Sequence, residues 1–228
     1  MDNIMIQPIA KMQSDFRSKF GIPRQSGLVE ELTSTIVFEP EYRNADMLRG
    51  IDGYSHLWLI WQFSENADQK WSPTVRPPRL GGNTRMGVLA TRSPFRPNFL
   101  GLSCVKLIGV EQTTQFGTVL HISGADLMNG TPIFDIKPYV PYADCQPNAV
   151  GGFTDTAGDF LLEVDFPACL LQMLPEGKRQ AVLALLSHDP RPSYHDDPER
   201  AYGLSFAGFN IRFRVEKKTL SVIEVTPE

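Results

Sequence analysis

Proline and glycine divide this chain into short segments, and that division limits the folds open to it. The 228-residue sequence holds 18 prolines and 18 glycines along its whole length. The runs between them are short and β-like, and no long helical pattern occurs before about residue 165. Closely spaced short strands with Pro/Gly turns are typical of barrels and sandwiches rather than of βαβ folds. We therefore predict a mainly β fold, with an antiparallel β-barrel as its main domain.

Runs rich in β-branched and aromatic residues mark the expected strands. They cover residues 5–9, 35–38, 56–63, 86–90, 104–112, 117–123 and 133–138. The run 55–63 is almost continuously apolar, so we expect it in the centre of a sheet with both faces covered. Residues 103–112 and 117–123 should form a hairpin closed over residues 113–116.

A change of character after residue 145 predicts a second, smaller unit. Residues 148–159 are polar and glycine-rich without any period, which indicates a linker or mobile loop. Residues 177–187 carry apolar positions at helical spacing, and two strands are expected at 209–216 and 220–225. We predict a barrel domain over residues 1–145, a linker over 146–160 and a small α+β C-terminal domain over 161–228.

Composition favours a soluble protein of a reducing compartment. The three cysteines, Cys104, Cys145 and Cys169, form no CxxC pair, and the four histidines are scattered, so we expect no metal site. The sequence has no apolar run long enough for a secretory signal or a membrane span. We therefore expect a cytoplasmic location and no membrane partner.

A basic stretch stands out against the net charge of −4: residues 70–106 hold seven basic residues and no acidic one. Such a local excess of positive charge favours an anionic partner. In the turn 92–98, two prolines fix the spacing of Arg92 and Arg96, whose guanidinium groups match phosphate and carboxylate oxygens. The alternative interpretation is a solvated surface turn whose arginines pair with carboxylates of nearby loops.

Three other turn-rich segments cover residues 19–27, 125–139 and 188–195. Residues 126–130 could form a backbone cradle for a small polar ligand, with Asp126 binding an ammonium or hydroxyl group, or simply a β-turn. Residues 189–192 could equally end the preceding helix, because prolines cannot continue it. The sequence has no nucleophile elbow, P-loop, GxGxxG or HExxH motif, so hydrolase, kinase and dinucleotide-binding functions lose their usual support.

Six motifs follow one another along nearly the whole chain. They are IPRQ (22–25), YSHLW (54–58), RPPRLGGN (76–83), GVLATRSPFRPNFLGLSCVKL (87–107), DLMNGTPIFDIKPYVPYAD (126–144) and DPRPSY (189–194). Together they resemble the TsaA-like family, whose characterised bacterial members are the TrmO tRNA methyltransferases. The resemblance implies a β-barrel enzyme that uses S-adenosylmethionine to methylate the exocyclic amino nitrogen of threonylcarbamoyladenosine at position 37 of threonine tRNAs. It also implies a homodimer with the cofactor near the subunit interface.

Carried over motif by motif, the resemblance implies a cofactor site built from four separate segments. Its residues are Pro23, Arg24, Gln25, Phe63, Ser64, Arg92, Leu102, Asp126, Leu127, Met128, Asn129 and Gly130. Two positions depart from the family pattern. Ser64 stands where members often carry His, which weakens the case for a side-chain role there, and Phe99 replaces a commonly seen proline.

An arginine beside the cofactor's sulfonium would be repelled, so arginines should face the cofactor's carboxylate or the RNA. The candidate catalytic residues are Arg92, Asp126 and Asp189, with Asp126 expected at the cofactor's amino group. The candidate tRNA-binding residues are Arg76, Arg79, Arg85, Arg96, Lys137, Arg191 and Tyr194. Lys137 could instead form a plain cross-strand ion pair with Asp135. Two other functions remain open: a non-catalytic RNA-binding barrel, and a methyltransferase of small molecules.

Overall fold

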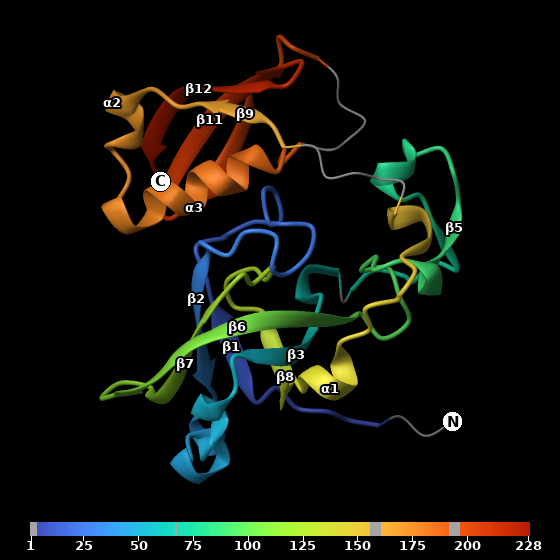
Figure 1. Ribbon diagram of the computed structural model, residues 1–228, viewed down its shortest axis with the longest axis vertical. Helices are drawn as coiled ribbons and strands as arrows, with labels where there is room; N and C mark the ends of the chain where they lie inside the picture. The colour runs from blue at the N-terminus through green and yellow to red at the C-terminus, as the bar shows by residue number, and fades with distance from the viewer. Residues whose placement is uncertain (1–3, 67, 156–160, 192–196) are drawn as a thin grey trace.

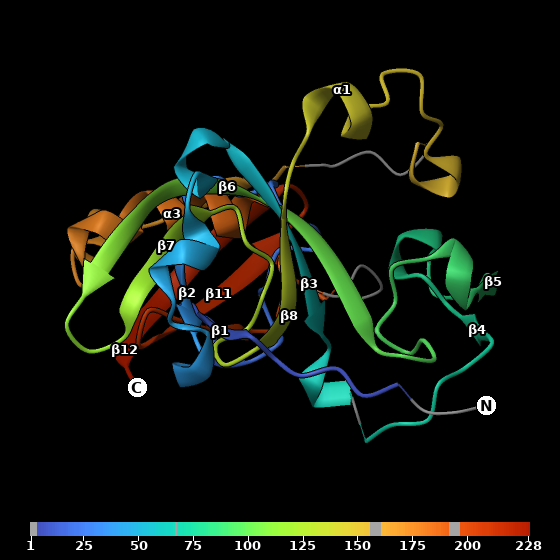
Figure 2. The ribbon, with the colours of Figure 1, turned by 90° about the horizontal axis from the view of Figure 1, so that it is seen from below.

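Six antiparallel strands of the N-terminal half pair side by side in a closed barrel (Figures 1 and 2). They are β1, Ala10–Gln13; β2, Thr33–Phe38; β3, His56–Gln62; β6, Leu100–Thr113; β7, Gly117–Ser123; and β8, Pro132–Pro138. The order around the ring is β1-β2-β7-β6-β3-β8, and β8 pairs with β1 again. The structure is a computed structural model that describes residues 4–66, 68–155, 161–191 and 197–228, with Arg79 described by its backbone alone.

The hairpin between β6 and β7 forms as the sequence predicts. The pair Thr113 and Gly117 closes it, and the two strands stay paired along most of their length. The long strand β6 also pairs with β3, from Gln62 opposite Leu100 to His56 opposite Lys106. This pairing places the end of β3 beside the start of β6, where the candidate functional site lies.

The expectation that residues 55–63 are covered on both faces is wrong. Strand β3 alternates: Leu57, Leu59 and Trp61 are buried in the barrel, while its other residues are half-exposed on the outside. The outer face is apolar for a different reason. Trp58 packs against the ring of Tyr139 at 5.8 Å between centroids, and Ile60 lines a cavity.

The expected strand at residues 5–9 is also wrong, since the first strand begins at Ala10. Ile4 and Met5 are 90% and 93% exposed, so their apolar side chains have nothing to pack against. In β1 itself, Ala10 and Met12 are fully buried, and both edges of the strand find partners. The apolar composition is similar in both segments, so pairing and burial decide where the strand begins.

The C-terminal part is a four-stranded sheet with one helix on its face (Figure 1). Its strands are β9, Glu163–Asp165; β10, Tyr202–Phe206; β11, Phe209–Glu216; and β12, Thr219–Pro227, in the order β10-β11-β12-β9. The helices are α2, Ala168–Leu171, and α3, Glu176–Ser187; a further short helix, α1, Pro141–Asp144, follows the barrel. The predicted helix and the two predicted terminal strands are confirmed, and the mainly β character with them.

The core of the C-terminal part includes a loop from the other end of the chain. Phe16, Val29 and Leu32 lie between β1 and β2 in sequence, yet they are buried with the apolar side chains of α3 and the C-terminal sheet. The barrel has a separate core around Leu57, Leu120 and other inward-facing residues. The loop at residues 14–32 therefore ties the two parts together.

A small lobe stands outside both cores. It carries the two-stranded sheet of β4, Thr74–Val75, and β5, Met86–Gly87, which is set apart from the barrel in Figure 1. Of the strand expected at 86–90, only this β5 forms, and Val88–Ala90 make a 3-10 turn. Within the described residues, no helix is long and apolar enough to cross a membrane, and no group of three His, Cys, Asp or Glu residues is placed to hold a metal ion.

Candidate functional site

A cavity of about 620 Å³ lies where β3 ends and β6 begins. Its wall comes from four segments that are far apart in sequence: the loop 19–25, the end of β3 with the residues after it, the turn 91–96 with the start of β6, and residues 126–131. Cavities of this volume, with apolar walls and a few polar groups, are typical sites for small molecules and cofactors.

Nine of the twelve predicted cofactor-binding residues line this cavity. They are Pro23, Arg24, Gln25, Phe63, Ser64, Arg92, Leu102, Asp126 and Met128. The fold brings them together because β3 and β6 are neighbours, and because residues 124–126 follow β7 directly and meet the loop 19–27. Gly27 donates its backbone N–H to the carbonyl of Gly124 at 2.8 Å and so fixes that approach.

The structure places the other three, Leu127, Asn129 and Gly130, away from the cavity. Leu127 is buried in the barrel core. The Asn129 side chain accepts a hydrogen bond from the backbone of Ser14 at 3.2 Å, and Gly130 has a φ of 81°, the left-handed region that favours glycine. Residues 128–131 thus form a β-turn, the alternative interpretation of this motif, and only its two end residues, Met128 and Thr131, line the cavity.

Two carboxylates line the described part of the cavity, and Asp126 is the more buried of them, since Glu65 is exposed. The Ser103 hydroxyl donates to its Oδ1 at 2.6 Å. Burial raises the pKa of Asp126, while the hydrogen bond from Ser103 and the charge of Arg92 act in the opposite direction. Such a carboxylate suits a cationic group that enters the cavity, because the cation replaces the water that burial has removed.

Arg92 is exposed and lies on the rim, and it donates a hydrogen bond to the Gln25 side chain. Arg96 turns back on its own loop and donates to the carbonyls of Thr91 at 3.1 Å and Ser93 at 3.4 Å. Both arginines line the cavity, and Arg96 in addition holds its own turn in shape.

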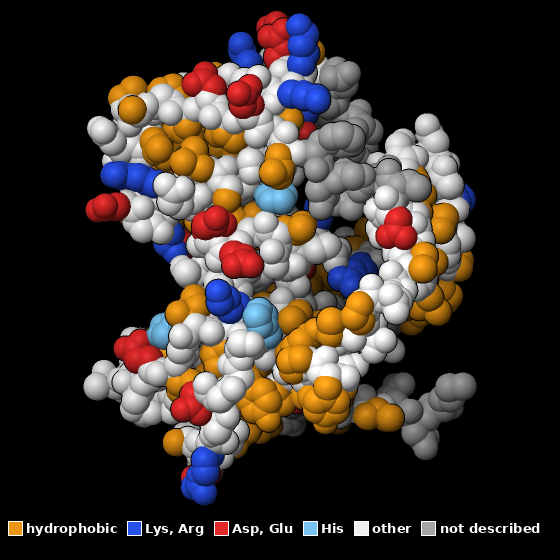
Figure 3. Space-filling view, viewed as in Figure 1, with side chains coloured by type: hydrophobic (Ala, Val, Ile, Leu, Met, Phe, Trp, Pro, Cys, Tyr) orange, Lys and Arg blue, Asp and Glu red, His pale blue; other side chains and the backbone are white. Residues whose placement is uncertain are grey.

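A second, wider cavity of about 1280 Å³ adjoins the first and shares Arg24, Gln25, Thr91, Arg92 and Pro94 with it. Four arginines line it, namely Arg24, Arg76, Arg85 and Arg92, and its described lining includes no Asp or Glu. Figure 3 shows basic side chains in the hollow beside the lobe that carries β4 and β5. A cavity with this charge favours an anionic ligand.

Asp189 and Arg191, the described residues of the 189–194 motif that were predicted for the site, lie against the loop that carries Arg24. Arg24 donates to the backbone carbonyls of Asp189 and Arg191, at 3.4 and 3.3 Å. The Asp189 carboxylate itself binds the Arg191 guanidinium at 2.9 and 3.0 Å, and neither residue lines either cavity. Tyr194 lies outside the described residues, as does the side chain of Arg79.

Lys137 stands on β8, away from both cavities. Its Nζ lies 2.9 Å from Asp135 Oδ2, so the expected ion pair forms, but within one strand and not across two. The structure therefore separates Lys137 from the arginines with which it was grouped.

Comparison with known proteins assigns the family. The family model of the tRNA-methyltransferase O N-terminal domain matches residues 11–145, and that of the TrmO C-terminal domain matches residues 161–228. The chain belongs to the TrmO family. A TrmO relative from Escherichia coli K12, named tRNA (adenine(37)-N6)-methyltransferase, is 38% identical over 235 residues and covers all of both chains. A protein of the same name from Eikenella corrodens is 46% identical over 72% of this chain and 92% of its own.

A solved TrmO structure has the same overall fold. The crystal structure of TrmO from Pseudomonas aeruginosa superimposes with a TM-score of 0.79 and 30% identity, over 99% of this chain and 100% of that chain. Because the match spans both parts of the chain, membership of the TrmO family applies to the C-terminal domain as well as to the barrel.

The TrmO motifs did not single out several residues of the cavity wall. Trp61, Gln62 and Gly101 line it, and Lys19 does so from the loop, where its Nζ donates to the Asn66 side chain at 3.0 Å. Among these residues, Gly101 was the one that the sequence could have indicated, because a glycine inside a strand often marks a close approach of another group. A Cβ on Gly101 would lie 2.3 Å from Cε2 of the Trp61 indole.

Proposed function

We propose that this chain is an S-adenosylmethionine-dependent methyltransferase that modifies adenosine 37 of tRNA. The names of its full-length relatives and its membership of the TrmO family support this proposal. The observation that carries it is the pair of joined cavities. One is of the size of a cofactor and holds a buried carboxylate; the other is wider and lined by arginines, and Arg24, Gln25 and Arg92 belong to both.

The residues of the smaller cavity fit S-adenosylmethionine. The Asp126 carboxylate would bind the ammonium group of its methionine part, and the guanidinium groups of Arg24 or Arg92 its carboxylate. Ile60, Phe63 and Leu102 give the apolar surface that an adenine ring needs. Bound there, S-adenosylmethionine supplies the methyl group from its sulfonium.

The wider cavity would hold the target nucleotide. We propose threonylcarbamoyladenosine of threonine tRNAs as that nucleotide, with direct in-line transfer to its exocyclic amino nitrogen. Its threonyl carboxylate and the adjoining phosphates are anions, which four arginines without a nearby described carboxylate would bind. The chain's part in the reaction is to position the two reactants, because transfer from a sulfonium needs orientation more than covalent help.

We also propose a cytoplasmic homodimer. The surface of β6 supports the second copy, because its apolar side chains Leu102, Ile108 and Val110 are 55%, 54% and 40% exposed. Leu102 also lines the cofactor cavity, so a dimer formed through this face would lie beside the site.

Two measurements test the proposal. Calorimetry of the purified full chain with S-adenosylmethionine should show binding without RNA; a silent titration would favour a non-catalytic RNA-binding barrel. Mass spectrometry of threonine tRNA nucleosides, from a deletion strain with and without the gene, should show the methylated nucleoside only when the gene is present. An enzyme that acts on small molecules instead would leave the tRNA unchanged and would lack the steep salt dependence of RNA binding.

A further inference from the structure

A chain of hydrogen bonds reaches the cavity carboxylate from behind. The Trp61 indole N–H donates to the Ser103 hydroxyl at 2.9 Å, and the Ser103 hydroxyl donates to Asp126 Oδ1 at 2.6 Å. Trp61 and Ser103 are 6% and 1% exposed, so water does not compete for these bonds. Asp126 and Trp61 line the cavity, whereas Ser103 does not and touches the carboxylate only from the protein side.

The chemistry of the three groups fixes the direction of this chain. An indole N–H is a donor only, so the Ser103 oxygen must accept from it. The hydroxyl proton is then left to point elsewhere, and the carboxylate is the acceptor within reach. A serine hydroxyl that would otherwise rotate is thereby held as a donor to the charged form of Asp126.

Gly101 makes room for the indole. It pairs with Trp61 across β3 and β6, and the indole lies over its Cα, where a Cβ would come within 2.3 to 2.6 Å of three ring atoms. Phe63 holds the ring from another direction, edge-on at 4.4 Å between centroids. The orientation of the indole is therefore set by its packing, before any ligand enters.

We propose that Trp61 and Ser103 are positioning residues that hold the Asp126 carboxylate in one orientation toward the cavity, with Gly101 as the residue that permits this arrangement. Its consequence for S-adenosylmethionine rests on the proposed function. The charged groups that line the same cavity are Lys19, Arg24, Glu65, Arg92 and Arg96. Of these, Arg92 lowers the pKa of Asp126 through its charge.

Ser103→Ala tests the proposal in the full chain. Without the hydroxyl, the carboxylate loses a hydrogen bond to its charged form, so affinity for S-adenosylmethionine should fall about tenfold. The pH below which binding weakens should also move upward, which a merely structural change would not cause. Ser103→Thr keeps a hydroxyl and should restore most of the wild-type affinity and most of the wild-type pH dependence. Thr118→Val is the matched control, since it removes a buried hydroxyl that bonds Gln112 at 2.6 Å elsewhere in the barrel.

A second measurement does not depend on the cofactor. The Asp126 carboxyl can be titrated by carbon-13 NMR in the ligand-free protein, where Ser103→Ala should raise its pKa and Thr118→Val should not. Gly101→Ala should raise it as well, because the displaced indole no longer orients Ser103. An unchanged Asp126 titration in Ser103→Ala overturns the inference. Failure of the wild-type chain to bind S-adenosylmethionine would instead count against the proposed function alone.

Discussion

Gly21 lies directly against Leu204: a Cβ on Gly21 would come within 2.1 Å of the Leu204 Cδ1. Gly21 belongs to the loop that carries Pro23, Arg24 and Gln25, and Leu204 is fully buried in the C-terminal sheet. The turn that borders the smaller cavity is therefore in direct contact with the C-terminal domain. That domain supports the loop of the site, and Arg24 adds a link through its hydrogen bonds to the carbonyls of Asp189 and Arg191.

Gly21→Ala should destabilise the protein by about 2–4 kcal/mol, from left-handed backbone strain together with the clash. Urea unfolding measures this loss. Gly50→Ala is the control, because Gly50 has a similar φ of 83° but nothing within 4 Å of its Cβ position. Gly50→Ala should lower the free energy of unfolding only by the backbone strain, about 1 kcal/mol. Equal losses in the two variants would show that the contact with Leu204 contributes nothing.

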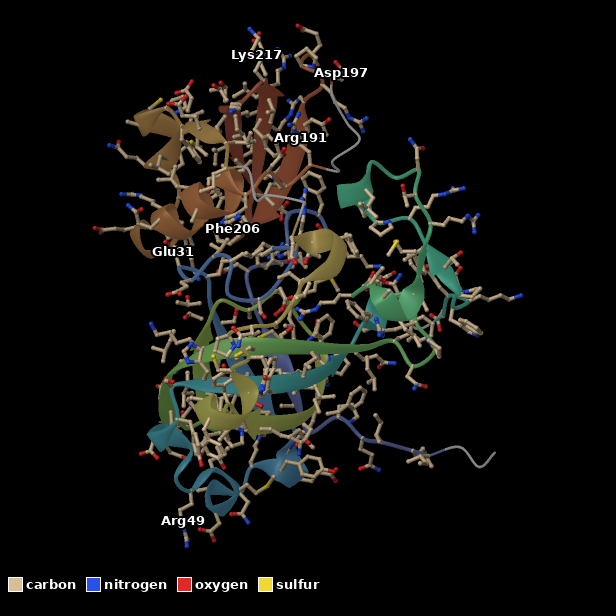
Figure 4. All side chains as sticks on the ribbon, turned by 45° about the vertical axis from the view of Figure 1, so that its right-hand side comes forward. Glu31, Arg49, Arg191, Asp197, Phe206 and Lys217 are labelled. Carbon is tan, nitrogen blue, oxygen red and sulfur yellow. The ribbon has the colours of Figure 1, made fainter. Side chains whose placement is uncertain are left out.

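Arg92→Ala should lower the rate of tRNA methylation about a hundredfold or more, since one preorganised charged group is removed from the shared wall of the two cavities. Its thermal unfolding should stay unchanged, because Arg92 is exposed. Arg49→Ala is the matched control: Arg49 is also exposed and lies at the far end of the molecule from Arg191 and Phe206 (Figure 4). Wild-type turnover by Arg92→Ala would remove this residue from the site.

Arg76→Ala and Arg85→Ala should each raise the KM for tRNA and leave that for S-adenosylmethionine near the wild-type value, because both line only the wider cavity. If each guanidinium meets one phosphate, the logarithmic salt slope of tRNA binding should fall by about 0.9 per variant. Filter binding over a series of salt concentrations measures this slope. Arg212→Ala, which removes an arginine paired with Glu224 on the C-terminal sheet, should leave it unchanged.

Asp126 should make cofactor binding depend on pH. Burial raises its pKa, so the carboxylate takes up a proton at a higher pH than an exposed Asp would. An ammonium group binds the charged form, so affinity for S-adenosylmethionine should fall as the pH drops through the raised pKa. Calorimetry across this range should show weak, pH-independent binding for Asp126→Asn. A wild-type affinity that is flat in acid would exclude contact between Asp126 and the ammonium group.

Protonation of Asp126 should increase the folding stability, whereas it should weaken the binding of S-adenosylmethionine. With a folded pKa above the unfolded value, ionisation disfavours the folded state, and this penalty disappears as the pH falls through the folded pKa. Asp126→Asn should therefore be at least as stable as the wild type at neutral pH, although its cofactor binding is impaired. Urea unfolding at two pH values gives the comparison.

The sequence correctly predicted the elements whose formation depends on neighbouring residues in the chain. The hairpin of β6 and β7 and the helix α3 follow from period and turn residues. Strand β9 escaped prediction because it has three residues and exists through parallel pairing with β12. The burial of Phe16 in the C-terminal core could not be predicted either, because a loop has no hydrophobic periodicity that indicates what it packs against.

The candidate site likewise contains residues that the sequence could predict and residues that it could not. The motifs named Pro23, Arg92 and Asp126, and the fold brings them to one cavity. They did not name Ser103, which sits inside a strand like any buried alternate residue. Its role depends on Trp61 on one side and Asp126 on the other, and only their arrangement in space brings the three together.

Each of the six strands in the ring has a paired neighbour on both sides, so none of them is an edge strand. Another polypeptide cannot lengthen this part of the protein by adding a strand. A nucleic acid or a second subunit must instead meet side chains and loops on its outer surface. Changes in what this protein recognises can therefore arise by substitution at those exposed positions, without disturbing the strand pairing that holds the cavity walls in place.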